Sequence, residues 1–213
     1  MFIAFTSSAF AQKKIEITEG TSAFLNGSQN AFSFVIYNGD MKEVTKAWEK
    51  QLKDLKGKVS SKDEIFADDC KVKEMGSNTF DVYSKVEEAL GEGIRVYAAF
   101  DLGGAYLSSA AHPAKVIPAK NMLYNFALEQ TREVVKGEIK LAEKVLGERE
   151  AEFAALAKNQ SQLESDIIDY QKKIENSKAA IIAIQQLQMA KRTEVEIQKT
   201  VAKGLDDKMK AVN

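Results

Sequence analysis

The chain of 213 residues contains few of the residues that usually carry chemistry or cross-links. It has one cysteine, Cys70, which excludes an intramolecular disulfide. Asp68 and Asp69 precede this cysteine and oppose the positive surroundings that a reactive thiolate needs. We therefore expect Cys70 to be buried and inert, like a small apolar side chain. The chain also lacks a basic excess, since its net charge is −1, so nothing predicts a nucleic-acid surface.

The common motifs of enzymes are missing as well. The sequence has no GxxxxGK[ST], HExxH, GxSxG or CxxC pattern. Gly103 and Gly104 lack the third glycine of a dinucleotide-binding turn, and the carboxylates at 63, 64, 68 and 69 lack the spacing of a calcium loop. We therefore predict a non-enzymatic protein with no catalytic residue, no cofactor and no metal site.

No stretch of the sequence approaches the roughly 18 consecutive apolar residues of a transmembrane helix. At the N-terminus, MFIAFTSSAFAQ has a short apolar run followed by Ala9-Phe10-Ala11, which is typical of a signal-peptidase site. The basic start of such a peptide is missing and is expected upstream of Met1. We predict that residues 1–11 are the remainder of a signal peptide and that the mature protein is periplasmic or secreted. The alternative is an ordinary buried strand.

Proline is also rare, and its two occurrences, Pro113 and Pro118, lie close together. Aromatic residues are frequent before Met122, and only Phe153 and Tyr170 follow Phe126. The later part is rich in Glu, Lys, Gln and Ala, a composition that is typical of long helices. We therefore predict a head domain at 12–118 and a long helical region at 119–213.

The head shows the pattern of an α+β fold. Residues 31–37 place Phe32, Phe34 and Ile36 on one face of a strand. Asp40 and Glu43 form a capping box before a helix whose apolar residues include Trp48 and Leu52, and Gly57 is expected at its C′ position. Further strands are predicted at 13–18, 58–60, 64–67, 70–73, 79–86 and 93–101. The order of these elements indicates an antiparallel sheet with a helix packed on one of its faces. The sequence does not specify on which face the helix packs.

A heptad pattern follows the head without a change of phase, and most of its core positions are apolar. These positions are Leu128, Arg132, Val135, Ile139, Ala142, Leu146, Arg149, Phe153, Leu156, Gln160, Leu163, Ile167, Tyr170, Ile174, Ser177, Ile181, Ile184, Gln188, Lys191, Val195, Gln198, Ala202, Leu205, Met209 and Val212.

The heptads at 128–212 predict a coiled coil, formed either by one long helix that pairs with another chain or by a helical hairpin. The hairpin would turn at 158–161, at 175–178 or near Gln188, none of which contains Gly or Pro. The unbroken phase favours a long helix and a homo-oligomer or protein partner, whereas polar core residues such as Gln160 and Lys191 weaken the pairing.

The segment FDLGGAYLSSAAHPAK, residues 100–115, gathers the rare residues of the chain. Its candidate ligand-binding or joint residues are Asp101, Gly103, Gly104, Ser108, Ser109 and His112. A catalytic role would require one of the serines, His112 and a carboxylate to meet. We instead expect a turn that joins the last strand to the helical region, because glycine adopts positive φ and proline suits the first turn of a helix.

Two further interpretations remain open. The head could bind a small ligand or a lipid in a pocket lined by Phe32, Phe34, Phe80 and Phe100. Alternatively, the most apolar stretch of the helical region, residues 179–187, could hold a client protein.

Several segments together resemble a family of uncharacterised exported proteins of Gram-negative bacteria. They are AFAQ at 9–12, FADD at 66–69, FDLGGAYLSS at 100–109 with His112-Pro113, LYNFALEQ at 123–130, and the coiled-coil region. The resemblance covers nearly the whole chain. It implies a secreted α+β head with a helical tail, and it assigns no catalytic residue.

Overall fold

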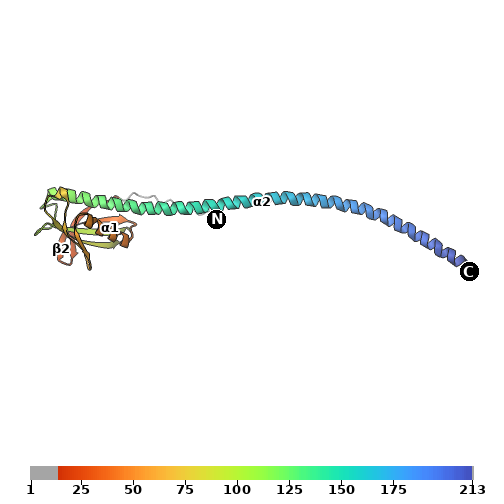
Figure 1. Cartoon of the computed structure of the whole chain (residues 1–213), viewed down its shortest axis with the longest axis horizontal. Helices are drawn as coiled ribbons and strands as arrows, with labels where there is room; N and C mark the ends of the chain where they lie inside the picture. Colours follow the sequence, from red (N-terminus) through yellow and green to blue (C-terminus); the bar gives the residue numbers. More distant parts are fainter. Residues whose placement is uncertain (1–13, 213) are drawn as a thin grey trace. The chain divides into compact units, whose positions relative to one another are not determined.

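The structure, a computed structural model, describes residues 14–212. The signal-peptide prediction for residues 1–11 lies outside this range. The elements in chain order are β1 (Thr18–Phe24), β2 (Gly27–Tyr37), α1 (Met41–Asp54), β3 (Lys58–Ser61), β4 (Ile65–Cys70), a 3-10 turn η1 (Lys73–Met75), β5 (Phe80–Ala89), β6 (Gly93–Asp101) and α2 (Pro113–Ala211). The predicted α+β head with an antiparallel sheet, followed by a long helix, is confirmed (Figure 1).

The strands form one six-stranded antiparallel sheet in the order β1-β2-β6-β5-β4-β3. Phe32, Phe34 and Ile36 of β2 point to the same face, as the alternation predicted, and are almost fully buried there. Helix α1 packs on this face, where the rings of Phe34 and Trp48 lie 6.1 Å apart. The face on which α1 packs, which the sequence left open, is therefore the Phe32 face.

Several predicted boundaries are wrong in detail. The strand expected at 13–18 begins instead at Thr18, and the two strands expected at 64–67 and 70–73 are one strand, β4, with an irregularity between Ala67 and Cys70. Helix α2 begins at Pro113 rather than near Ala119, and Pro118 lies inside it. Because Pro118 is close to the helix start, its missing N–H disturbs only one early backbone bond.

Helix α1 begins and ends for different reasons. Asp40 caps its start by accepting a hydrogen bond from the Glu43 amide at 3.0 Å, as predicted. At its end, the left-handed residue is Lys56, with φ 70°, and not Gly57. Gly57 is needed for another reason, because a Cβ there would lie 2.5 Å from the Cys70 sulfur and 2.9 Å from the Leu52 carbonyl oxygen.

The chain divides into two compact units, Met1–Glu143 and Lys144–Asn213. The first unit includes the beginning of α2, which buries Val116, Ala119, Leu123, Phe126 and Ala127 in the head. The Phe126 ring lies 5.9 Å from Phe34 and 5.0 Å from Trp48. The first turns of α2 therefore complete the hydrophobic core of the head.

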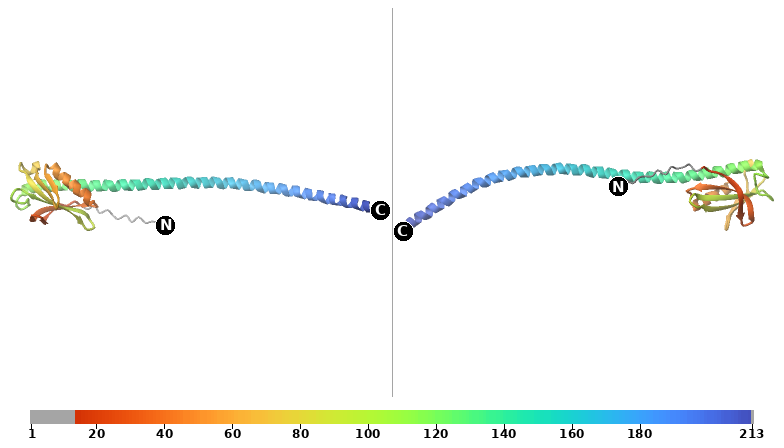
Figure 2. Two further views of the ribbon diagram at one scale, coloured as in Figure 1. Left: turned by 60° about the horizontal axis from the view of Figure 1, so that its bottom comes forward. Right: turned by 180° about the vertical axis from the view of Figure 1, so that it is seen from behind.

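The second unit is helical from Lys144 to Ala211, and Figure 2 shows this part of α2 without a break. None of the turns that a hairpin requires, at 158–161, at 175–178 or near Gln188, is present there. The structure therefore has the continuous helix. The heptad core residues from Leu128 to Met209 lie on it, and Val212 follows its last residue, Ala211.

Candidate functional site

The loop between β6 and α2 is built by its own polar residues. Asp101 accepts hydrogen bonds from the amides of Gly103 (2.9 Å) and Gly104 (3.2 Å), and both glycines have positive φ. Ser108 accepts one from the Ala111 amide at 3.2 Å, and its carbonyl accepts another from the His112 amide at 2.8 Å. These hydrogen bonds shape the turn that leads from β6 into α2.

The groups that a catalytic arrangement would need do not meet in this loop. The Nδ1 atom of His112 is buried and has no hydrogen-bond partner among the described residues. Ser109 instead donates from its amide to Glu19 at 2.8 Å and from its hydroxyl to the same carboxylate. The structure thus joins Ser109 to a carboxylate of β1, and among the described residues the His112 side chain forms no hydrogen bond with either of them.

Glu19 is a polar centre of the head that sequence reasoning missed. Besides Ser109, its carboxylate accepts a hydrogen bond from the Asn30 side chain at 3.2 Å and lies 3.6 Å from the Lys120 ammonium. Asn30 also donates to the Leu107 carbonyl at 2.7 Å. We call Glu19, Asn30, Ser109 and Lys120 the Glu19 cluster. It links β1, β2, the joint loop and the start of α2.

The cluster changes the acidity of its central carboxyl group. Burial by itself raises the pKa of Glu19, because it disfavours the charged form. Hydrogen bonds from Ser109 and Asn30, together with the charge of Lys120, outweigh burial and hold this pKa below its ordinary value. Glu19 is therefore an ionised structural anchor, and its partners occupy the lone pairs that a ligand would use.

Cys70 lies at the end of β4 and is fully buried. Burial, followed by the charges of Asp81, Asp68 and Asp69, raises the pKa of its thiol to about 12. The two aspartates therefore act against a thiolate, as their position before Cys70 suggested, although burial is the larger cause. Asp69 itself pairs with Lys58 at 2.9 Å. In the part of the chain that the structure describes, no three metal-ligating side chains come together.

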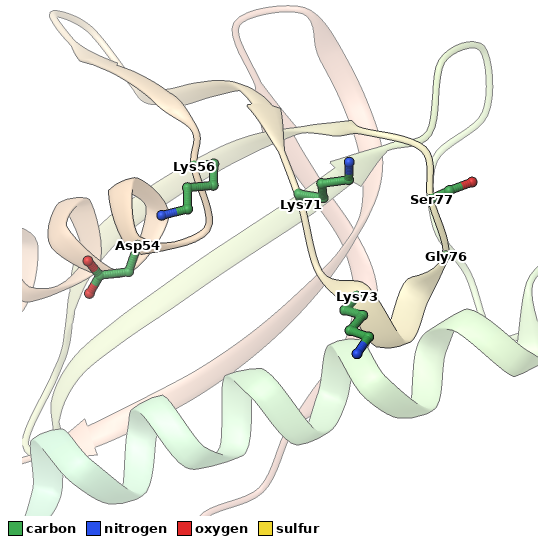
Figure 3. Close-up of a pocket in the computed structure, with 6 residues that line it drawn as sticks. All are labelled: Asp54, Lys56, Lys71, Lys73, Gly76 and Ser77. Carbon is green, nitrogen blue, oxygen red and sulfur yellow. The ribbon is translucent and has the colours of Figure 1, made fainter.

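One open pocket of the head has a volume of about 620 Å³. It is lined by Asp54, Lys56, Lys71, Lys73, Gly76 and Ser77 (Figure 3). Its three ammonium groups point in different directions in Figure 3, so they do not converge on one position for an anion. The phenylalanines that the sequence proposed for a ligand pocket are elsewhere and pack against one another, with Phe100 6.0 Å from Phe32 and 5.7 Å from Phe80.

The largest unpartnered feature of the described residues lies on α2. At the heptad core positions of 144–212, large apolar side chains are exposed to half or more of their area. They are Leu146, Phe153, Leu156, Leu163, Ile167, Tyr170, Ile174, Ile181, Ile184, Val195, Leu205 and Met209. We call this set the α2 stripe. Soluble monomers rarely expose a contiguous apolar patch above a few hundred Å², so the α2 stripe is the candidate functional site.

The charged residues of this part of the helix form only local pairs. Arg149 and Glu152 are 2.7 Å apart, Glu175 and Lys178 2.8 Å, and Lys191 and Glu194 2.6 Å, each pair one turn apart on the helix. Such exposed pairs contribute about 0.3–0.5 kcal/mol each. These pairs stabilise the helix, and they do not cover the apolar side chains of the α2 stripe.

No protein-family model matches the chain, and no curated protein or solved structure shows significant similarity to it. The resemblance to exported proteins therefore remains a prediction. Within residues 14–212, every helix is too short or too polar to cross a membrane.

Proposed function

We propose that this protein is a non-enzymatic, exported protein of the cell envelope that acts by self-association through the helical region of α2. The observation that carries the proposal is the α2 stripe, a heptad-spaced row of exposed apolar side chains on one continuous helix. Isolated helices are marginally stable in water and gain most of their stability from packing an apolar face. A second helix packed on the stripe would bury that face by knobs-into-holes contacts.

A matched pair of double substitutions tests this function. Ile167 and Ile181 lie on the stripe, whereas their neighbours Ile168 and Ile182 lie outside the core positions and are exposed to a similar extent, 53% and 57% against 55%. We expect Ile167→Glu/Ile181→Glu to weaken self-association at least about 100-fold, because two buried side chains per helix become charged. Ile168→Glu/Ile182→Glu adds the same charge and should have little effect.

Sedimentation equilibrium of residues 12–213 at micromolar concentrations measures this difference. A native chain that is monomeric there overturns self-association. Equal weakening by both double variants would show that charge, and not the stripe, controls the assembly.

Export is supported by the Ala9-Phe10-Ala11 pattern. When the chain is expressed in a Gram-negative host with a basic signal-peptide start added before Met1, we expect the mature protein to begin at Gln12 and to leave the cytoplasm. Mass spectrometry of fractionated cells checks this. An unprocessed chain that stays in the cytoplasm contradicts it.

A further inference from the structure

The charged residues beside the α2 stripe are divided by sign along the helix. With Arg132 at heptad position a, positions e and g flank the core. Between 138 and 166, the charged residues at these positions are all acidic: Glu138, Glu143, Glu150, Glu152, Glu164 and Asp166. Between 171 and 208 they are mostly basic: Lys173, Lys178, Arg192, Lys199 and Lys208, with Glu194 and Asp206 as the exceptions. A helix with one acidic and one basic half complements a copy of itself that runs in the opposite direction.

We propose that the occupant of the α2 stripe is a second copy of this chain in antiparallel orientation, with the whole stripe overlapped. This inference rests on the self-association proposed above and adds its orientation and register. In this alignment Leu146 lies opposite Gln198 of the second copy, and Ile174 lies opposite its Tyr170. The two-fold axis passes near Lys172.

The flanking charges match in this register. In an antiparallel pair, e positions face e positions and g positions face g positions. Position e then places Glu143 opposite Lys199, Glu150 opposite Arg192 and Glu164 opposite Lys178. Position e also pairs Lys136 with Asp206, and the two-fold axis repeats every pair. At position g, Lys208 faces Glu138, whose carboxylate also accepts a hydrogen bond from the Asn38 side chain at 3.2 Å. Like charges meet only where Glu152 faces Glu194 and where Lys173 faces its own copy.

A shift of one heptad keeps fewer attractive pairs and adds new like-charge contacts. In one direction it places Glu143 opposite Asp206, and in the other it places Lys136 opposite Lys199. Glu143, Glu150 and Arg192 form no ion pair within the described residues, so these charges remain available for a second copy.

The parallel, in-register arrangement brings like charges together. There, position g faces position e five residues further along the partner, so Glu138 meets Glu143 and Lys173 meets Lys178. The core is also unfavourable, because Arg149 and Lys191 would each lie against their own copies. In the antiparallel register, Arg149 lies opposite Val195 and Lys191 opposite Phe153, where their aliphatic stems cover apolar surface and their charged ends reach water.

Cysteine cross-linking distinguishes the two orientations in the full chain. Leu146→Cys and Gln198→Cys are made separately, and the native Cys70 is retained because it is fully buried. Positions 146 and 198 are about 78 Å apart along one helix at 1.5 Å per residue. We expect disulfide-linked dimers only when the two variants are mixed, and neither variant should cross-link with itself.

A charge exchange tests the register. Glu150→Lys should weaken self-association about tenfold, because two attractive pairs per dimer become repulsive. Adding Arg192→Glu to the same chain should restore it, since the exchanged charges attract again. Glu148→Lys makes the same change of charge outside positions e and g and should leave the affinity within about twofold.

Self-cross-linking of either single cysteine variant, or absence of rescue by Arg192→Glu, overturns the antiparallel register while leaving self-association intact. A monomeric native chain in sedimentation overturns the proposed function itself.

Discussion

Glu19 shows how a single side chain can hold distant parts of a fold together. Its partners Ser109 and Lys120 are far from it in sequence, and each satisfies a carboxylate that is partly removed from water. A buried polar group that loses such partners costs about 1–3 kcal/mol. The sequence could not reveal this role, because nothing near Glu19 indicates which loop will lie beside it. The same holds for Gly57, where a glycine is needed because Cys70 of β4 lies so close to it.

The lowered pKa of Glu19 gives a testable dependence on pH. A carboxyl group whose pKa is depressed in the folded state adds stability that is fully present above its unfolded pKa, about 4.3, and is lost as pH falls through the folded value. We expect Glu19→Gln to lower the free energy of unfolding by roughly 1–3 kcal/mol at pH 7, with a smaller deficit at pH 3.

Urea unfolding followed by Trp48 fluorescence measures the deficit at each pH. Glu16→Gln removes an exposed carboxyl group from the same segment and serves as the control. The same deficit at pH 7 and pH 3 would show that the ionised form of Glu19 is not what stabilises the head.

The elements that the sequence predicted well are those with a strong local signal. The apolar alternation of β2 and the capping box of α1 are contained within a few residues, and both elements are present. The edge strand β1 was misplaced because it buries only Phe24 and is held by backbone bonds to β2. The heptads predicted a long helix in the same local way. They did not exclude a hairpin, because a helix in a hairpin has the same period.

The candidate functional residues show the same difference between local and long-range signals. The stripe was visible in the sequence because its residues recur at fixed spacing on one helix. The hydrogen bonds of Ser109 could not be predicted from the sequence. Its partner Glu19 is 90 residues away along the chain, whereas His112, which the sequence suggested, is only three residues away.

At the scale of the whole molecule, the chain offers separate probes for its two kinds of structure. Trp48, the only tryptophan, lies in the core of the head, whereas most helical residues belong to α2. If α2 pairs with a second copy, we expect the midpoint of thermal unfolding seen by circular dichroism at 222 nm to rise by several degrees for a tenfold increase in protein concentration. The midpoint seen by Trp48 fluorescence should change less.

Thermal unfolding is followed by circular dichroism and by fluorescence at about 2, 20 and 200 μM protein. Over this range, mass action predicts a measurable shift in the midpoint of the helical signal. The Ile167→Glu/Ile181→Glu variant is the control and should show no concentration dependence. A helical signal that melts at the same temperature at every concentration would argue against pairing.

The contribution of α2 to the head also determines when the head can be completed during synthesis. Phe126 and Ala127 are its last deeply buried core residues, and Phe126 stacks edge-on against Trp48. The sheet and α1 therefore emerge from the ribosome with one side of their core uncovered until the first turns of α2 have been made. If the chain is exported as proposed above, this delay leaves the head incompletely folded, and so still able to pass through a secretion channel, until residues 126 and 127 have been made.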